Sequence, residues 1–205
     1  MYRLHSAMDI QQSLLMTVLM ILPITMMGQQ TSEPVQLEEG DMAPHFSAET
    51  AGGEAWNSRE QYGDGWVVVY FYPAAMTGGC TAQACSFRDN RTKLTEMGAE
   101  VVGISGDRQE NLRIFQRLNN LNFPLISDRD GSIARAFGVE TRDGGTITRE
   151  VDGETVELTR DVTTARWTFI VDPSGTVVYK DTEVDAAGDS ERVLTALQRL
   201  QRENS

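Results

Sequence analysis

The sequence predicts an α/β fold, in which a sheet containing parallel strand pairs is covered by helices on both faces. A continuous apolar run predicts a buried strand, helical spacing follows it, and the same order then repeats. Such alternation implies right-handed crossovers between neighbouring parallel strands. At 205 residues the chain is long enough for one substantial hydrophobic core, so we expect one folded domain.

The central strand is predicted at residues 66–72, a run of apolar and β-branched side chains that reads as buried on both faces. It is bounded by Gly65 and Pro73. After a Gly-Gly pair, residues 81–97 carry apolar side chains in roughly helical spacing, and Gly98 offers a stop. We therefore expect one helix over 81–97.

A second strand and helix follow at once. Residues 100–104 form a short apolar strand, and residues 110–121 place Leu112, Phe115 and Leu118 at three-residue steps. This repeat of strand and helix is the basis for the predicted parallel pairing.

The pattern then changes to one of hairpins. Val151-Asp152-Gly153 separates two polar segments, and its Asp-Gly step is a hairpin turn signal, so we expect an exposed hairpin near residues 145–158. Residues 166–171 and 176–179 read as two more strands joined by a tight turn, and these should pair antiparallel. The last helix is expected to begin with Ser190 as its N-cap and to pack on the sheet.

The start of the chain reads as a targeting segment. Residues 14–27 are an apolar run of fourteen residues without charge, after a short polar segment with Arg3. A signal-peptide core needs about 7 to 15 apolar residues and a membrane span about 20. We expect residues 1–28 to be a signal peptide or membrane anchor, 29–39 a linker and 40–205 the domain. Export to the periplasm or outside is favoured over a membrane-anchored or cytoplasmic location.

The net charge and the histidine content argue against several classes of binding site. Thirty acidic residues against eighteen basic ones give a net charge of -12, which repels phosphate backbones, so no nucleic-acid partner is expected. His45 is the only histidine after residue 28, which argues against a multi-histidine metal site or a Cys-His nucleophile pair. We expect no metal and no cofactor, and a structural or surface role for His45.

The two cysteines of the chain, Cys80 and Cys85, stand where the central strand gives way to a helix. Unpaired N–H groups and the helix dipole favour a thiolate there, so Cys80 is the expected nucleophile. Five residues of helix rise about 7.5 Å and turn about 140°. Because a disulfide needs α-carbons within roughly 7 Å, pairing would unwind the first turns. Taken alone, the cysteines also allow a structural disulfide or two inert buried thiols.

The segment from Pro73 to Cys80 has proline, three residues, threonine, two residues and cysteine. This pattern resembles the active site of the peroxiredoxins, and the longer stretch 72–89 resembles their peroxiredoxin Q branch, which includes bacterioferritin comigratory protein. Supporting resemblances lie at residues 40–46, 103–105 and 123–128, so the likeness covers about residues 38–203. It implies a thioredoxin-like fold with a central mixed sheet.

The resemblance also implies a thiol-dependent peroxidase that reduces hydrogen peroxide and organic hydroperoxides. Cys80 would become a sulfenic acid that condenses with Cys85, and thioredoxin or a similar dithiol donor would reduce the disulfide. Thr77 would hold the peroxide, Arg166 would donate N–H groups, and Pro73 would shield the pocket. The resemblance further implies no cofactor and a monomer.

Five other residues near the site carry smaller expectations. Gln83 stands where relatives have a side chain that braces the active-site hydrogen bonds. Gly78-Gly79 replaces the usual Pro-Gly, so we expect a more mobile loop before Cys80. Ser105 and Asp107 follow a strand end, where loop capping is the favoured role.

Three alternatives stay open at this point. A thioredoxin-like thiol-disulfide oxidoreductase has the expected fold, but it usually carries two residues between its cysteines, and this pair has four. A copper-binding thioredoxin-fold chaperone would want a closer cysteine pair and a ligand histidine. A structural exported domain stapled by one disulfide would lose stability on reduction.

Overall fold

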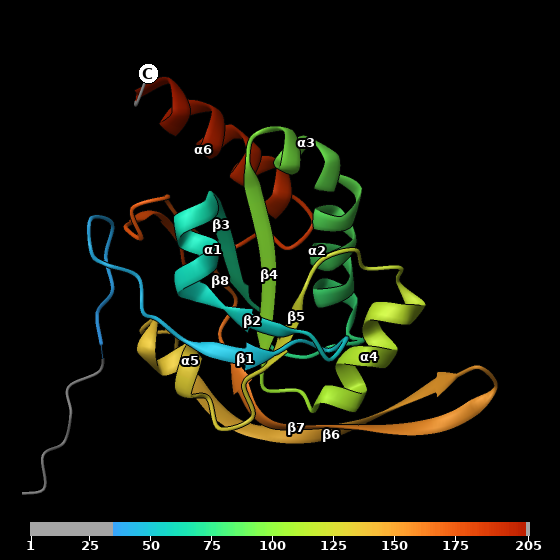
Figure 1. The fold of residues 1–205 in the computed structure, drawn as a ribbon. Helices are drawn as coiled ribbons and strands as arrows, with labels where there is room; N and C mark the ends of the chain where they lie inside the picture. The colour runs from blue at the N-terminus through green and yellow to red at the C-terminus, as the bar shows by residue number, and fades with distance from the viewer. Residues whose placement is uncertain (1–34, 204–205) are drawn as a thin grey trace, which may run out of the picture. The chain divides into compact units, whose positions relative to one another are not determined.

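The computed structural model describes residues 35–203, and Figure 1 shows how their elements are arranged. The predicted targeting segment 1–28 and the first residues of the predicted linker lie outside this part of the chain. Helices and strands alternate through the first half, and strands dominate after α5. In chain order the elements are β1 (Ser47–Glu49), β2 (Ala55–Asn57), α1 (Ser58–Asp64), β3 (Trp66–Phe71), α2 (Gly78–Asp89), α3 (Arg91–Glu96), β4 (Ala99–Ser105), α4 (Gln109–Leu118), β5 (Leu125–Ser127), α5 (Ser132–Ala136), β6 (Thr141–Val151), β7 (Glu154–Thr164), β8 (Trp167–Val171), β9 (Val177–Asp181) and α6 (Asp189–Glu203).

Within residues 35–203, the main sheet has five strands in the order β5-β4-β3-β8-β9. β3 pairs parallel with β4 and β4 with β5, whereas β8 runs antiparallel to both β3 and β9. The sheet is therefore mixed, and both predicted strand pairings are confirmed. β3 is the central strand and is buried on both faces, because its side chains from Val67 to Phe71 are at most 1% exposed.

The sheet has a hydrophobic core on each face. Alternate side chains of β3 point to opposite faces, so Val68 and Tyr70 join one core while Val67, Val69 and Phe71 join the other. The first core is closed by α2, α3, α4 and α6, and the second by α1 and the α5 region. Helices thus cover both faces, as the alternation of elements predicts.

The helix predicted at 81–97 differs in both its start and its continuity. It begins earlier, at Gly78, and it breaks at Asn90 into α2 and α3. Asn90 has a backbone conformation off the helical region (φ -95°, ψ 5°), and its side-chain amide donates to Ser190 Oγ at 2.9 Å and Glu191 Oε1 at 3.0 Å. The break is thus stabilised by contacts with α6 that no local pattern reveals.

The expected hairpin is present but far longer than predicted. β6 and β7 have eleven residues each, and Asp152 and Gly153 form the turn with positive φ, as the Asp-Gly signal implies. In Figure 1 the hairpin runs along one end of the sheet and extends past α4. The expectation of an exposed hairpin holds only in part, because Val151 and Leu158 are buried.

Two helix ends also differ from expectation. α6 begins at Asp189, so Ser190 lies in its first turn and is not the N-cap. α4 ends at Leu118 and not at residue 121, because Asn120 takes a left-handed conformation (φ 49°).

Within the described residues, no helix is both long and apolar enough to cross a membrane.

Candidate active site

Strand pairing brings distant parts of the chain together at one end of the central strands β3 and β8. β3 ends at Phe71, which pairs with Trp167 at the start of antiparallel β8. The loop from Pro73 to α2 therefore begins at the same end of the sheet at which Arg166 precedes β8. This register explains how Arg166 meets Cys80, a residue 86 positions away.

Cys80 is the third residue of α2 and is only 2% exposed. Its sulfur accepts a hydrogen bond from Arg166 Nη2 at 3.3 Å. Gly79 leaves room for this contact, because a β-carbon at that position would lie 3.4 Å from the same nitrogen. A guanidinium beside the sulfur and the N-terminus of α2 both favour negative charge at this point.

A buried hydrogen-bonded chain continues from Arg166. Arg166 Nη1 donates to Gln83 Oε1, and Gln83 Nε2 donates to Asp189 Oδ2 at 2.7 Å. Thr168 Oγ1 donates to the same carboxylate oxygen at 2.8 Å. Gln83 is fully buried and therefore braces the arginine as expected.

Asp189 and Thr168 are members of this chain that sequence reasoning missed. Burial raises the pKa of Asp189 to about 6, against the lowering effect of its bonds to Gln83 and Thr168. An aspartate at the start of a helix is ordinarily interpreted as a favourable helix-dipole contact. No local signal distinguishes that role from one at the active site.

The loop between β3 and α2 carries Thr77 at the N-cap position of α2. The Thr77 hydroxyl donates to the carbonyl of Ala74 at 2.8 Å, so its lone pairs are left to accept. Asp107 braces the same loop, since its Oδ2 accepts from the Ala75 N–H at 2.7 Å and from Ser105 Oγ at 2.9 Å. The loop-capping role expected for Ser105 and Asp107 is confirmed.

The prediction that Gly78 and Gly79 lie in a loop before Cys80 is wrong. Both glycines lie within the first turn of α2 and not in a loop before it. The tight backbone of the segment lies two residues before Gly78, at Met76, which has φ 61°.

Cys85 lies in the same continuous helix as Cys80, and both thiols are free. Cys85 is half-buried, and its sulfur lies 3.9 Å from Asn119 Oδ1 at the end of α4. Helix geometry separates the two cysteines by about 7.5 Å along the axis. The wound helix therefore keeps the thiols apart, and a disulfide between them requires α2 to open.

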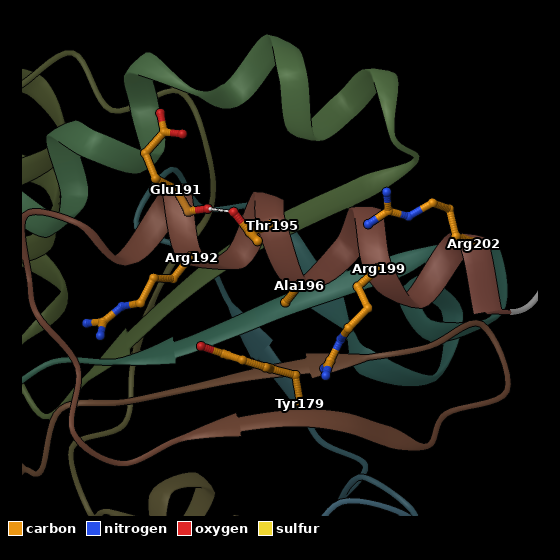
Figure 2. A pocket seen from close by; sticks show the side chains of 7 residues that line it. All are labelled: Tyr179, Glu191, Arg192, Thr195, Ala196, Arg199 and Arg202. Atoms are coloured by element: carbon orange, nitrogen blue, oxygen red, sulfur yellow. Dashed lines mark hydrogen bonds between the residues drawn. The ribbon is translucent and has the colours of Figure 1, made fainter.

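A groove of about 610 Å³ lies away from the residues described above. Figure 2 shows it between β9 and α6, with Tyr179 opposite the helix and three arginines spaced along it. None of the expected site residues lines it. Its lining is Tyr179, Glu191, Arg192, Thr195, Ala196, Arg199 and Arg202. The groove is therefore separate from the side chains of Cys80, Cys85 and Arg166. Within residues 35–203, no three His, Cys, Asp or Glu side chains are placed to hold a metal ion, and His45 is exposed beside Tyr62.

Comparison with known proteins identifies the family. The AhpC/TSA family model matches residues 39–180. A Mycobacterium tuberculosis protein whose name assigns it to the peroxiredoxins is 40% identical over 157 residues, which are 77% of this chain and 92% of the relative. The chain belongs to the AhpC/TSA family of peroxiredoxins.

Other relatives specify the branch of this peroxiredoxin. Peroxiredoxin Bcp of Escherichia coli is 48% identical over 103 residues, or 50% of this chain and 65% of the relative. A solved bacterioferritin comigratory protein of Xanthomonas campestris, studied for alkyl peroxide reduction, has a TM-score of 0.61 at 30% identity, over 75% of this chain and 90% of that one. The chain is a thiol-dependent peroxidase with the thioredoxin-like fold of the Bcp and peroxiredoxin Q branch.

Proposed function

We propose that Cys80 is the residue that reduces the peroxide. Its thiolate sulfur attacks one peroxide oxygen, the O–O bond breaks, and the departing oxygen leaves as hydroxide or alkoxide and takes up a proton. Cys80 is then a sulfenic acid. The observation that carries this assignment is the 3.3 Å contact between Arg166 Nη2 and the Cys80 sulfur at the start of α2.

Three neighbours support the attack. The Arg166 guanidinium stabilises the thiolate, and it also stabilises the negative charge that develops on the departing oxygen. The free lone pairs of Thr77 accept the O–H of the peroxide and hold it in line with the sulfur. Pro73 has no N–H to donate and, at the end of β3, limits the access of water to the sulfur.

We propose that Cys85 resolves the sulfenic acid. Its thiol sulfur bonds to the Cys80 sulfur, the S–O bond breaks, and water leaves. The first turns of α2 must unwind for this step, and Gln83 lies within the segment that moves. Unwinding therefore breaks the hydrogen bond between Gln83 and Asp189. It also displaces Phe87, whose ring stacks on that of Tyr70 with 4.8 Å between the centroids.

The experiment that tests this proposal is stopped-flow oxidation of the reduced chain by hydrogen peroxide. Trp167 lies next to Arg166, so tryptophan fluorescence should report the reaction. We expect a fast second-order phase that consumes both thiols per peroxide. Oxidation no faster than that of a free cysteine would contradict the role of Cys80.

Two variants distinguish the roles of the two cysteines. Cys80→Ser should abolish peroxide reduction. Cys85→Ser should complete one turnover and then stall, or depend on external thiols. Full recycling of Cys85→Ser by thioredoxin would contradict the resolving role. Catalysis of disulfide exchange without peroxide turnover would instead indicate a thioredoxin-like oxidoreductase.

The family implies a peroxide substrate and a thioredoxin-type reductant. The reductant transfers two electrons to the Cys80–Cys85 disulfide and becomes a disulfide itself. We propose that the enzyme acts as a monomer, because both cysteines are supplied by one chain. A molecular mass in solution near 22.7 kDa supports this, and a dimer in both redox states contradicts it.

We also propose that residues 1–28 direct export, on the strength of their uncharged apolar run. The reductant must then be a thioredoxin-like donor that is available outside the cytoplasm. Fractionation of expressing cells, followed by N-terminal sequencing of the protein, tests this. Recovery of the uncleaved chain from the cytoplasm would contradict it.

A further inference from the structure

Three side chains from three different elements meet in a fully buried polar cluster behind Arg166. Gln83 comes from α2, Thr168 from β8 and Asp189 from the start of α6, and each is 0% exposed. Asp189 Oδ2 accepts from both of the others, at 2.7 Å from Gln83 and 2.8 Å from Thr168. The cluster therefore converges on a single carboxylate oxygen.

This arrangement determines the orientation of the Gln83 amide. A glutamine amide has one accepting and one donating end, and the two can exchange by rotation. Here the accepting end receives Arg166 Nη1, and the donating end points at Asp189. Because a carboxylate only accepts, it holds the NH₂ end of Gln83 towards itself and leaves the oxygen facing Arg166.

The position is a poor one for an aspartate that serves stability alone. Its second oxygen, Oδ1, is buried without a hydrogen-bond partner among the described residues. A buried, incompletely satisfied carboxylate is unfavourable for folding. Burial accordingly raises the pKa of Asp189 to about 6. A residue that costs stability at this point is better explained by what it orients.

We propose that Asp189 is a positioning residue for peroxide reduction: it fixes the Gln83 amide, and Gln83 in turn directs the Arg166 guanidinium at the Cys80 sulfur. The inference rests on the proposed role of Cys80 and Arg166. Asp189 touches neither peroxide nor sulfur, and acts only through the two intervening side chains. It also connects α6, at the end of the chain, to the chemistry at the start of α2.

Single-turnover kinetics with hydrogen peroxide tests this proposal in the full chain. Asp189→Ala removes the acceptor, so the second-order rate constant for Cys80 oxidation should fall about tenfold. Asp189→Asn keeps an oxygen that accepts, so it should stay within about threefold of the wild type. Thr195→Ala changes an exposed residue of the same helix, whose hydroxyl donates to the Glu191 carbonyl, and it is the matched control, with an unchanged rate.

A double-mutant cycle separates positioning from general damage. If Asp189 acts through Gln83, then Gln83→Ala and the double variant Gln83→Ala with Asp189→Ala should have the same rate constant. If the rate constant of the double variant falls by the product of the two single-variant factors, the proposal is overturned. A wild-type rate constant for folded Asp189→Ala would overturn it as well. Asp189→Ser, whose shorter side chain leaves the Gln83 amide out of reach, replaces Asp189→Ala if the latter does not fold.

The wild-type rate distinguishes this proposal from the one on which it rests. A slow wild-type reaction would contradict the role of Cys80 itself. A fast wild-type reaction together with an equally fast, folded Asp189→Ala variant would contradict the positioning role alone.

Discussion

Arg149 Nε donates a hydrogen bond of 2.9 Å to the carbonyl oxygen of Met76, which joins the β6–β7 hairpin to the active-site loop. Met76 has φ 61°, a conformation that is unfavourable for a side chain other than glycine and needs support from its surroundings. Met76 precedes Thr77. The hairpin therefore stabilises the backbone that places the expected peroxide-binding hydroxyl.

Removal of this contact should slow peroxide reduction without unfolding the protein. In Arg149→Ala the Met76 carbonyl loses a charged donor, a hydrogen bond typically worth about 1.5–3 kcal/mol, less where water replaces it. We expect the rate constant for Cys80 oxidation to fall by about three- to tenfold, measured by stopped-flow fluorescence.

The control for this prediction is on the same hairpin. Arg142 lies on β6 and is exposed, so Arg142→Ala should oxidise at the wild-type rate. Equal losses in both variants would show that charge on the hairpin, and not the contact with Met76, is responsible.

Proline at position 78 should slow resolution and leave peroxide attack unchanged. Gly78 is the first residue of α2, a position that proline favours, and a β-carbon there meets nothing within 4 Å. Gly78→Pro should stabilise the first turn by about 0.4–1 kcal/mol and so slow disulfide formation by roughly two- to fivefold. Quenched-flow trapping of thiols after peroxide addition measures this, and disulfide formation at the wild-type rate would count against unwinding from this end.

A methyl group at position 79 should affect the first step instead. In Gly79→Ala the new β-carbon would lie 3.4 Å from Arg166 Nη2, at the close limit of van der Waals contact, and would leave the guanidinium less room. Because Arg166 is directed at the Cys80 sulfur, we expect peroxide oxidation to slow by about two- to fivefold. An unchanged rate constant would show that Arg166 tolerates displacement.

Asp189 should make stability depend on pH between about 4 and 6. Its pKa is raised from 3.8 to about 6 in the fold, so the folded chain binds this proton more tightly than the unfolded chain does. The free energy of unfolding therefore falls as pH rises through this window, by as much as roughly 3 kcal/mol from this group. Burial is the main cause of the raised pKa of Asp189; its contacts with Gln83 and Thr168 lower the pKa, Asp181 raises it and Arg192 lowers it.

Urea unfolding of the wild type and Asp189→Asn across pH 4–8 isolates this effect, because the other acidic groups titrate in both proteins. The variant should lose the fall in stability between pH 4 and 6 and be the more stable of the two at pH 7. Parallel curves for the two proteins would contradict the raised pKa of Asp189.

Local patterns were sufficient for much of this fold. The apolar run at 66–72 predicted β3 because a strand buried on both faces needs no polar side chain, and the Asp152-Gly153 step predicted the hairpin turn because its backbone requires positive φ. Helix boundaries were less certain. The break at Asn90 depends on contacts with α6, and those contacts follow from packing and not from helical propensity.

By itself the sequence determined the family and predicted the reactive centre, because the Pro73-to-Cys80 pattern and the spacing of the two cysteines indicate a peroxiredoxin. Only the tertiary structure decided how the centre is supported. The antiparallel register of β3 and β8 brings Arg166 to Cys80, α6 brings Asp189 to Gln83, and the hairpin brings Arg149 to Met76. These partners are 73 to 106 residues apart, and side-chain contacts over such separations depend on sheet register and helix packing, which no local pattern encodes.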